Sequence, residues 1–171
     1  WSLDSALAYK RHFPAINWLT SYSLYLDTMA AWFNREQPGW TELRGKMMRL
    51  LQEESELDEI VKLVGMDALG AADRLKMEAA RSIREDFLHQ NSFHDVDTYT
   101  PLDKQRRMMQ LVVGYYEKCS DALGKGAPVE PLLGLPVREA IGRYKYTVPE
   151  QVEREYEKIQ AELDEEIAGV L

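Results

Sequence analysis

Cysteine is nearly absent from this sequence, which holds a single thiol, Cys119, in 171 residues. One thiol excludes an internal disulfide and fits a reducing compartment. No apolar run approaches the length of a membrane span and no signal-peptide pattern is present, so no direct membrane insertion is expected. The formal net charge of -8 argues against nucleic acid as a partner, because phosphate binding needs clustered lysine and arginine.

Motifs for self-contained catalysis are also missing. There is no G-x-x-x-x-G-K-[ST] loop to cradle phosphates, no H-E-x-x-H and no cysteine pair for zinc. Glu85 and His89 lie four residues apart and could share a metal, but a di-iron bundle needs two Glu-x-x-His motifs and further carboxylates. By its own residues, this chain is therefore not predicted to be an enzyme, and no metal site is expected.

Apolar residues recur at spacings of three and four along most of the chain, which indicates helices. The pattern predicts helices over about 21–33, 41–64, 71–88, from Pro101 to about 123, and from 149 almost to the end. The last carries a stripe of Val152, Tyr156, Ile159, Leu163 and Ile167. Cys119, inside the fourth pattern, is predicted to be a small core residue.

The remaining segments are predicted to be irregular. Residues 1–20 contain Phe13-Pro14, and the residue before a proline avoids the helical region. The glycine- and proline-rich segment 124–136 is expected to be a loop, with a short helix from about Pro136 to Gly142. The acidic run 53–59 is expected to be a solvated helix face. No alternating strand pattern competes, so the predicted class is all-α, a compact helical bundle with an irregular N-terminal arm.

One polar run interrupts the third helical pattern and is followed by apolar residues. After His89, Phe93, Val96 and Tyr99 come at intervals of three, before Pro101 ends the stretch. Two aromatic residues and a valine presented together can form a flat apolar platform. Taken alone, this stretch is better explained as a satellite cluster under a loop.

A second stretch, Tyr9 to Tyr25, changes that interpretation. Together with Asp86 to Tyr99, it closely resembles the catalytic A (alpha) subunit of V-type and A-type rotary ATPases, and the resemblance covers nearly the whole chain as its C-terminal part. It implies that residues 1–20 are the tail of a nucleotide-binding domain and that residues 21–171 form a C-terminal helical domain. The chain begins at Trp1 without an initiating methionine, which fits a fragment of a longer polypeptide.

The resemblance also implies an adenine pocket. In such subunits the aromatic residue before the proline packs on the adenine of ATP, so Phe13 is expected to face Phe93, with Val96 and Tyr99 completing the slot. Stacking on an aromatic ring contributes roughly 1–3 kcal/mol. ATP or ADP with Mg2+ is expected in the intact subunit only, because the phosphate ligands would lie in the preceding domain. Leu24 stands where non-catalytic subunits carry an arginine, which favours a catalytic subunit.

A third matching segment, Gly65 to Asp73, aligns with the acidic helix-turn-helix tip by which F-type beta subunits press on their rotor. The expected rotor contact comprises Asp67, Ala68, Leu69, Gly70, Ala71, Ala72 and Asp73. Its interior of alanine and glycine favours contact by shape over contact by charge. An ordinary helix-helix turn explains the same residues.

The sequence therefore predicts the domain that closes the adenine side of the ATP site and couples ATP hydrolysis or synthesis to rotation and to H+ or Na+ transport. Expected partners are the non-catalytic B subunits, in an alternating hexamer, and the central-stalk rotor. The expected location is cytoplasmic, peripheral to the membrane. Two alternatives stay open: a freestanding helical adaptor, and a metalloprotein built around Glu85 and His89.

Overall fold

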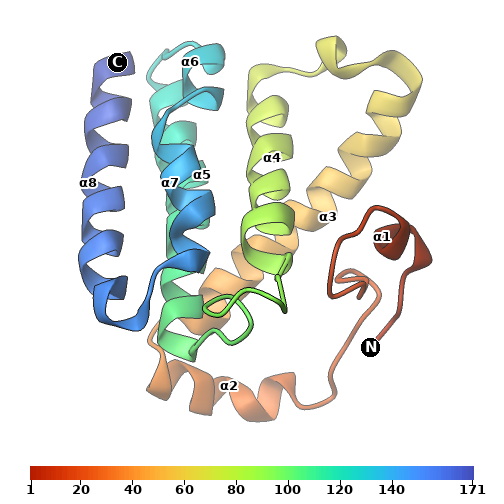
Figure 1. Cartoon of the computed structure of the whole chain (residues 1–171). Helices are drawn as coiled ribbons and strands as arrows, with labels where there is room; N and C mark the ends of the chain where they lie inside the picture. Colours follow the sequence, from red (N-terminus) through yellow and green to blue (C-terminus); the bar gives the residue numbers. More distant parts are fainter.

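The computed structural model describes all 171 residues, and their regular structure is helical (Figure 1). The α-helices are α1 Ser5–Tyr9, α2 Leu26–Glu36, α3 Trp40–Val64, α4 Ala71–Ser82, α5 Leu102–Gly124, α6 Val129–Leu133, α7 Val137–Arg143 and α8 Val152–Val170. Short 3-10 turns cover Met66–Ala68, Tyr144–Tyr146 and Pro149–Gln151, and a π-helical turn covers Ile83–Leu88. The only β pairing is an isolated bridge between Leu3 and Ile16. The all-α prediction is confirmed.

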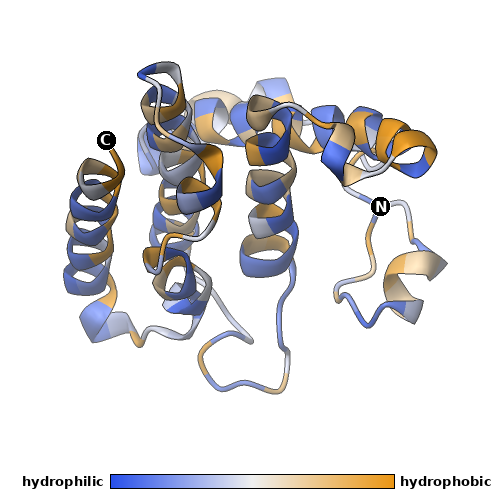
Figure 2. Ribbon diagram, turned by 90° about the horizontal axis from the view of Figure 1, so that it is seen from above, coloured by the Kyte–Doolittle hydropathy of each residue, from blue (hydrophilic) through white to orange (hydrophobic).

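Helix α5 lies at the centre of the bundle. It packs against α3, α4 and α8, and its buried residues include Met109, Leu111, Val112, Tyr115 and Cys119. Each helix presents a mixture of hydrophobic and hydrophilic residues around its circumference (Figure 2), so that apolar faces meet inside. The predicted core position of Cys119 is confirmed. None of the helices combines the length and apolar character needed to cross a bilayer.

The last helix follows the predicted stripe. Val152, Ile159, Leu163 and Ile167 of α8 are buried, and Tyr156 packs partly buried against the same core. The first turn is anchored by the hydroxyl of Tyr144, which donates a hydrogen bond to the carbonyl of Val152 over 2.8 Å. This confirms the prediction that the stripe lies along a groove of other helices.

Helix α2 begins later than predicted, at Leu26 rather than near Ser21. The Ser23 hydroxyl accepts a hydrogen bond from the Tyr25 backbone N–H over 3.2 Å, a local bond that competes with helix formation. The helix then continues to Glu36, and Gly39 with φ of 81° makes the turn into α3.

The predicted helix over 71–88 is divided in two. Regular α-helix ends at Ser82, and the chain widens into the π-helical turn Ile83–Leu88. Distant donors hold its carbonyls: His12 donates to the carbonyl of Arg84 over 2.8 Å, and Lys145 donates to that of Glu85 over 3.0 Å. The spacing of apolar residues cannot indicate this turn, because its hydrogen-bond donors lie far away in the sequence.

The segment 124–136 is not wholly a loop, because it contains α6. Pro131 is tolerated there since the first turn of a helix needs no N–H donors, and burial of Val129 and Leu132 stabilises the turn. The expected short helix near Pro136 is present as α7.

The acidic run 53–59 is not uniformly solvated. Glu54 is buried, and its carboxylate accepts hydrogen bonds from both Nε and Nη2 of Arg84; the shortest is 2.7 Å. The pair joins α3 to the π-helical turn. Burial of this carboxylate is possible because the planar guanidinium meets it with paired N–H groups.

The N-terminal arm lies on the side of the molecule opposite α8 (Figure 1). Asp4 begins α1 by accepting hydrogen bonds from the N–H groups of Ala6 and Leu7, so the arm is less irregular than predicted. The side chain of Asn17 donates to Asp4 over 3.0 Å and thereby closes the arm on itself. His12, which is buried, attaches this unit to the bundle through its bond to Arg84.

We expect His12→Ala to release the arm and leave the bundle folded, because His12 supplies its buried side-chain bond while the core lies elsewhere. Hydrogen exchange should accelerate at the amides of residues 2–20, and the thermal midpoint of the bundle should change little. Lys10→Ala, at an exposed neighbouring position, is the control and should leave exchange unchanged. Cooperative unfolding of the bundle in His12→Ala would contradict this separation.

Alkaline pH is expected to destabilise the fold through Cys119. Burial raises the pKa of this thiol from 9.0 to about 12. Between these pH values the thiol ionises in the unfolded chain but stays protonated in the folded chain. Its contribution to the free energy of unfolding is therefore complete below pH 9 and is lost as the pH rises toward 12. The free energy of unfolding of the wild type, relative to Cys119→Ala, should fall by about 1.4 kcal/mol per pH unit there. Denaturant titrations at pH 9, 10 and 11 measure this; a constant difference between the two proteins would contradict it.

Candidate functional site

The arm and the 89–101 loop, the two stretches predicted to form the base pocket, meet in the folded chain. The backbone N–H of Gln90 donates a hydrogen bond to the carbonyl of Phe13 over 2.8 Å. The ring of His12 lies 5.1 Å from the ring of His89, centroid to centroid. Residues separated by more than 70 positions in sequence are thus joined at the end of the π-helical turn.

The 89–101 loop is folded around a buried carboxylate. Asp97 is 2% exposed, and its Oδ2 accepts the backbone N–H of Asn91 over 2.6 Å. The side chain of Gln90 donates to the carbonyl of Asp97 over 2.7 Å, and the Nδ1 atom of His94 accepts the backbone N–H of Val96 over 3.2 Å. These local bonds give a loop without regular structure a defined conformation.

The predicted site residues differ in their exposure. The exposed fraction is 96% for Phe93, 77% for Tyr99 and 50% for Phe13, and Val96 is half-buried. Phe13 and Phe93 make no ring contact with each other; the aromatic contacts of the arm are those of His12 with Trp18 and His89. The structure therefore brings their two segments together and leaves both rings free to contact something else.

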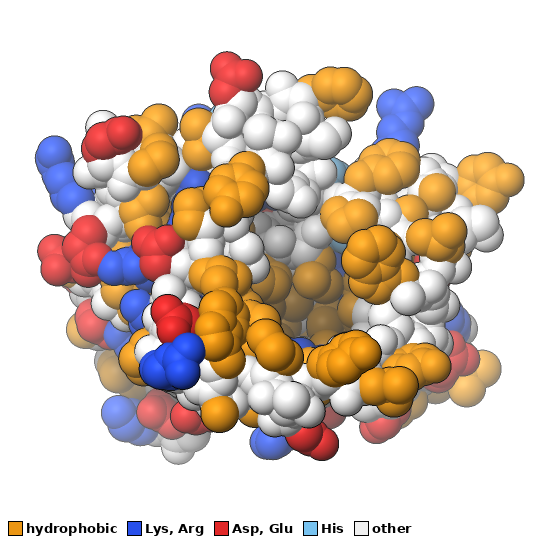
Figure 3. Space-filling view, turned by 90° about the horizontal axis from the view of Figure 1, so that it is seen from below, with side chains coloured by type: hydrophobic (Ala, Val, Ile, Leu, Met, Phe, Trp, Pro, Cys, Tyr) orange, Lys and Arg blue, Asp and Glu red, His pale blue; other side chains and the backbone are white.

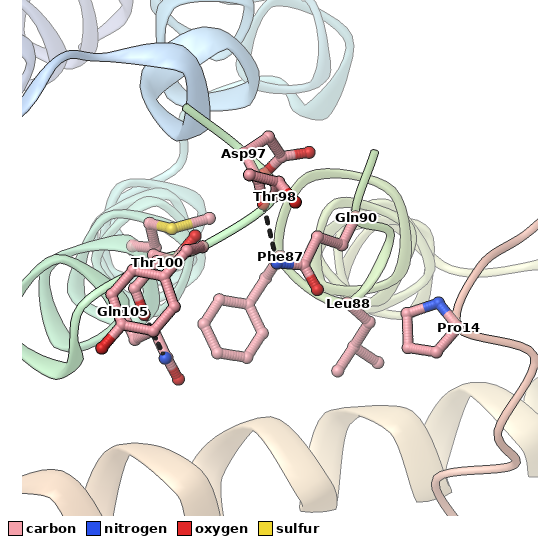
Figure 4. A pocket seen from close by; sticks show the side chains of 10 residues that line it. Pro14, Phe87, Leu88, Gln90, Asp97, Thr98, Thr100 and Gln105 are labelled. Carbon is pink, nitrogen blue, oxygen red and sulfur yellow. Dashed lines mark hydrogen bonds between the residues drawn. The ribbon is translucent and has the colours of Figure 1, made fainter. Parts of the chain in front are cut away.

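A cavity of about 300 Å³ lies at this junction (Figure 4). Pro14 of the arm borders one side, Thr100 of the loop borders another, and Phe87 and Leu88 lie between them (Figure 4). Tyr99 also lines the cavity. The lining also includes the amides of Gln90 and Gln105, which donate to the carbonyls of Asp97 and Thr100. An apolar floor with a few polar groups is typical of small-molecule sites.

Two further cavities adjoin the first. One of about 250 Å³ is mainly apolar, reaches Trp18 and α3, and shares Phe87, Leu88 and Gln105 with it. The other, of about 420 Å³, contains Val96 and shares Tyr99. Seen from below, the molecule is hollowed, and hydrophobic side chains surround the hollow (Figure 3).

The ionisable groups behind the junction are perturbed by burial. Burial lowers the pKa of His89 below its usual value, and the nearby positive charge of Lys145 adds to this effect. Burial raises the pKa of the Asp86 carboxyl, while a hydrogen bond from Ser82 opposes the shift. A Cβ atom at Gly142 would lie 2.9 Å from Asp86 Oδ1, so glycine is what permits this close approach of α7.

The junction contains no cluster of metal ligands. No three His, Cys, Asp or Glu side chains converge there, and the ring of His89 lies against that of His12.

The predicted contact segment Asp67–Asp73 lies at the far end of the α3–α4 hairpin (Figure 1). Asp67 and the residues from Gly70 to Ala72 are exposed, Leu69 and Asp73 are half-buried, and Asp73 pairs with Lys76 over 3.5 Å. The most exposed apolar side chains of the tip precede this segment: Leu63 is 86% exposed, Val64 61% and Met66 47%. The sequence prediction did not include them, although an apolar residue on the outer face of a helix end indicates a contact surface.

Other residues of the site were also not predicted. Asp97, Lys104 and Lys145 are buried polar groups that shape the 89–101 loop, and sequence reasoning treated none of them as functional. Their one visible signal is the proximity of Asp97 to the aromatic residues of that loop. Lys104 and Lys145 lie on helical segments where a lysine ordinarily faces water.

Comparison with known proteins identifies the family. A family model described as the C-terminal domain of V and A type ATP synthase matches residues 30–131. The chain is 56% identical over 172 residues to the V-type ATP synthase alpha chain of Acetivibrio thermocellus and 51% identical over 172 residues to that of Clostridioides difficile; both alignments cover 100% of this chain and 29% of the relative. The alpha chain of Thermoanaerobacter pseudethanolicus is 55% identical over 165 residues, covering 92% of this chain and 28% of the relative. The chain thus spans less than a third of the length of these relatives, and it belongs to the family of the C-terminal domain of V- and A-type ATP synthases.

Proposed function

We propose that this chain closes the adenine side of the ATP site in the catalytic subunit of a V/A-type ATP synthase and transmits that closure to the central stalk. The hydrogen bond from Gln90 N–H to the carbonyl of Phe13 is the observation that carries this proposal, because it holds the arm and the 89–101 loop at one edge of the molecule. Phe13 and Phe93 present their rings from those two segments. Val96 and Tyr99 of the 89–101 loop line a neighbouring cavity and are proposed to complete the contact with the base.

The residues present indicate which part of the nucleotide this chain would bind. They fit the flat, partly apolar base and do not fit Mg2+ or the phosphates, so residues 1–20 would be the end of a nucleotide-binding domain whose remainder supplies the phosphate ligands. ATP hydrolysis or synthesis is then an activity of the intact subunit. The helical domain, residues 21–171, contributes base binding and mechanical coupling.

The assembly proposed is that of a rotary motor. The chain would lie in an alternating hexamer with non-catalytic B subunits, around a central-stalk rotor, in a sector peripheral to the membrane. Base binding draws the rings of Phe13 and Phe93 together, and the packed helices move with them as one body, since a close-packed core transmits displacement. A freestanding adaptor is less favoured, because relatives that align with the full chain carry it within a longer polypeptide.

The tip of the α3–α4 hairpin is proposed as the rotor contact. Its outermost surface combines the apolar side chains of Leu63 and Met66 with the small residues 70–72, and its charges are few. Exposed charge pairs contribute only about 0–1 kcal/mol and are screened by salt. Contact by shape and apolar surface is therefore the mode that these residues support.

In the assembled enzyme, Phe93→Ala should weaken ATP binding by about 1–3 kcal/mol, the loss of one stacking face. Folding should be unaffected, because Phe93 is almost fully exposed. Phe93→Trp is the matched control and should retain affinity. Equilibrium binding of purine and pyrimidine nucleotides measures the effect; equal weakening of both classes would refute the stacking role.

Changing both Asp67 and Asp73 to Asn should leave coupled activity largely intact, since the contact depends on shape. Removing the turn Met66–Gly70 should uncouple hydrolysis from rotation, because the lever loses its end while the nucleotide pocket remains. Leu63→Ser is expected to lie between these extremes. Rotation or ion pumping, measured beside ATP hydrolysis in each variant, tests this order of effects. Full coupling after the deletion would show that another part of the subunit contacts the rotor.

A further inference from the structure

Two lysines are buried in this chain without a carboxylate partner. Lys104 is 3% exposed and Lys145 is 7% exposed. Burial of a cation is costly unless hydrogen bonds satisfy its N–H groups. Burial accordingly lowers the pKa of Lys104 below its usual value. Such residues require a compensating role, and both direct their ammonium groups at backbone carbonyls.

Lys104 lies in the first turn of α5, directly after the 89–101 loop. Its Nζ donates to the carbonyl of Lys145 over 2.6 Å and to that of Thr147 over 2.8 Å. It therefore ties the end of the loop to the 3-10 turn Tyr144–Tyr146 and the residue that follows.

Lys145 makes the complementary connection to the start of the loop. Its Nζ donates to the carbonyl of Glu85 over 3.0 Å and to that of His89 over 3.1 Å. These carbonyls lie at the end of the π-helical turn, where the helix dipole and unpaired acceptors favour a cation. The same short segment that receives Lys104 thus also holds His89.

The segment 144–147 is itself firmly seated. Tyr144 is buried, and its hydroxyl bonds to the carbonyl of Val152 in α8. The ring of Tyr146 contacts the ring of His94, in the middle of the loop, with centroids 4.5 Å apart. The start, the middle and the end of the loop therefore all rest on one anchored segment.

We propose that Lys104 and Lys145 are positioning residues that clamp both ends of the 89–101 loop to residues 144–147 and so hold its aromatic surface ready for the nucleotide base. The inference rests on the base-binding role proposed above. Neither lysine touches the nucleotide. Their effect on affinity acts through the loop, whose ordering cost is met in the folded protein rather than at the moment of binding.

The test uses the assembled enzyme and two probes, ATP and inorganic tripolyphosphate, which has no base. Lys145→Met and Lys104→Met should each raise the dissociation constant for ATP by at least about fivefold, up to the change seen with Phe93→Ala, since stacking is the most that can be lost. Affinity for tripolyphosphate should stay the same. Lys118→Met, on the exposed side of α5, is the control. Equal weakening of both probes would overturn the proposal.

A double-mutant cycle separates positioning from a general structural effect. If Lys145 acts through the loop, Lys145→Met should cause no further loss of ATP affinity in a Phe93→Ala background. Additive losses would overturn the clamp. Should Lys145→Met fail to fold, Tyr146→Ala removes the contact with His94 at a partly exposed position and should weaken ATP selectively; an unchanged ATP affinity there would also overturn it.

The two proposals fail in different ways. An unchanged ATP affinity in Phe93→Ala would remove the stacking role and with it the basis of the clamp. A loss in Phe93→Ala without any loss in Lys145→Met or Lys104→Met would retain base stacking and reject the clamp alone.

Discussion

The π-helical turn Ile83–Leu88 is the feature on which the rest of the site depends. Arg84 binds Glu54 of α3 through its side chain and His12 of the arm through its carbonyl. Glu85 offers its carbonyl to Lys145, and Asp86 lies against Gly142 of α7. A π-helical turn interrupts the regular hydrogen-bond pattern of the α-helix, and such turns are frequent at functional sites. Here the carbonyls of the turn are the points where the arm and the segment 144–147 attach.

Much of the bundle could be predicted because its helices obey local rules. The apolar stripe of α8 repeats at helical spacing, and Gly65, with φ of 86°, ends α3 as the sequence indicates. The buried position of Cys119 followed from the periodicity of α5. The proposal that Phe13 and Phe93 contact the base came from resemblance rather than from spacing, since an exposed aromatic residue in a loop has no periodic signature.

What escaped prediction has a common physical cause, which is dependence on partners distant in sequence. The burial of Glu54 requires Arg84, 30 residues away. The π-helical turn requires His12, 72 residues from Arg84, and Lys145, 60 residues from Glu85. Helix α6 was not predicted because its surroundings are rich in glycine and proline. It is stabilised by burial of Leu132 against α5 and by the Tyr115 hydroxyl, which donates a hydrogen bond to the carbonyl of Leu132. Local propensity gives way in each case to tertiary contact.

The same turn connects the docked arm and the 89–101 loop to the distant tip of the α3–α4 hairpin. Helix α4 runs without interruption from the tip at Ala71 to Ser82, a length of about 18 Å at 1.5 Å per residue. Its neighbour α3 is tied to it by the Glu54–Arg84 pair near the turn and by the Lys76–Glu53 pair, 3.2 Å apart, farther along. Two cross-linked helices with a packed interface bend less than either alone. The hairpin is therefore a stiff connection between the turn, where the arm docks, and the tip. If the tip is the rotor contact, as proposed, the rigidity of this hairpin matters more to coupling than the charges at its end.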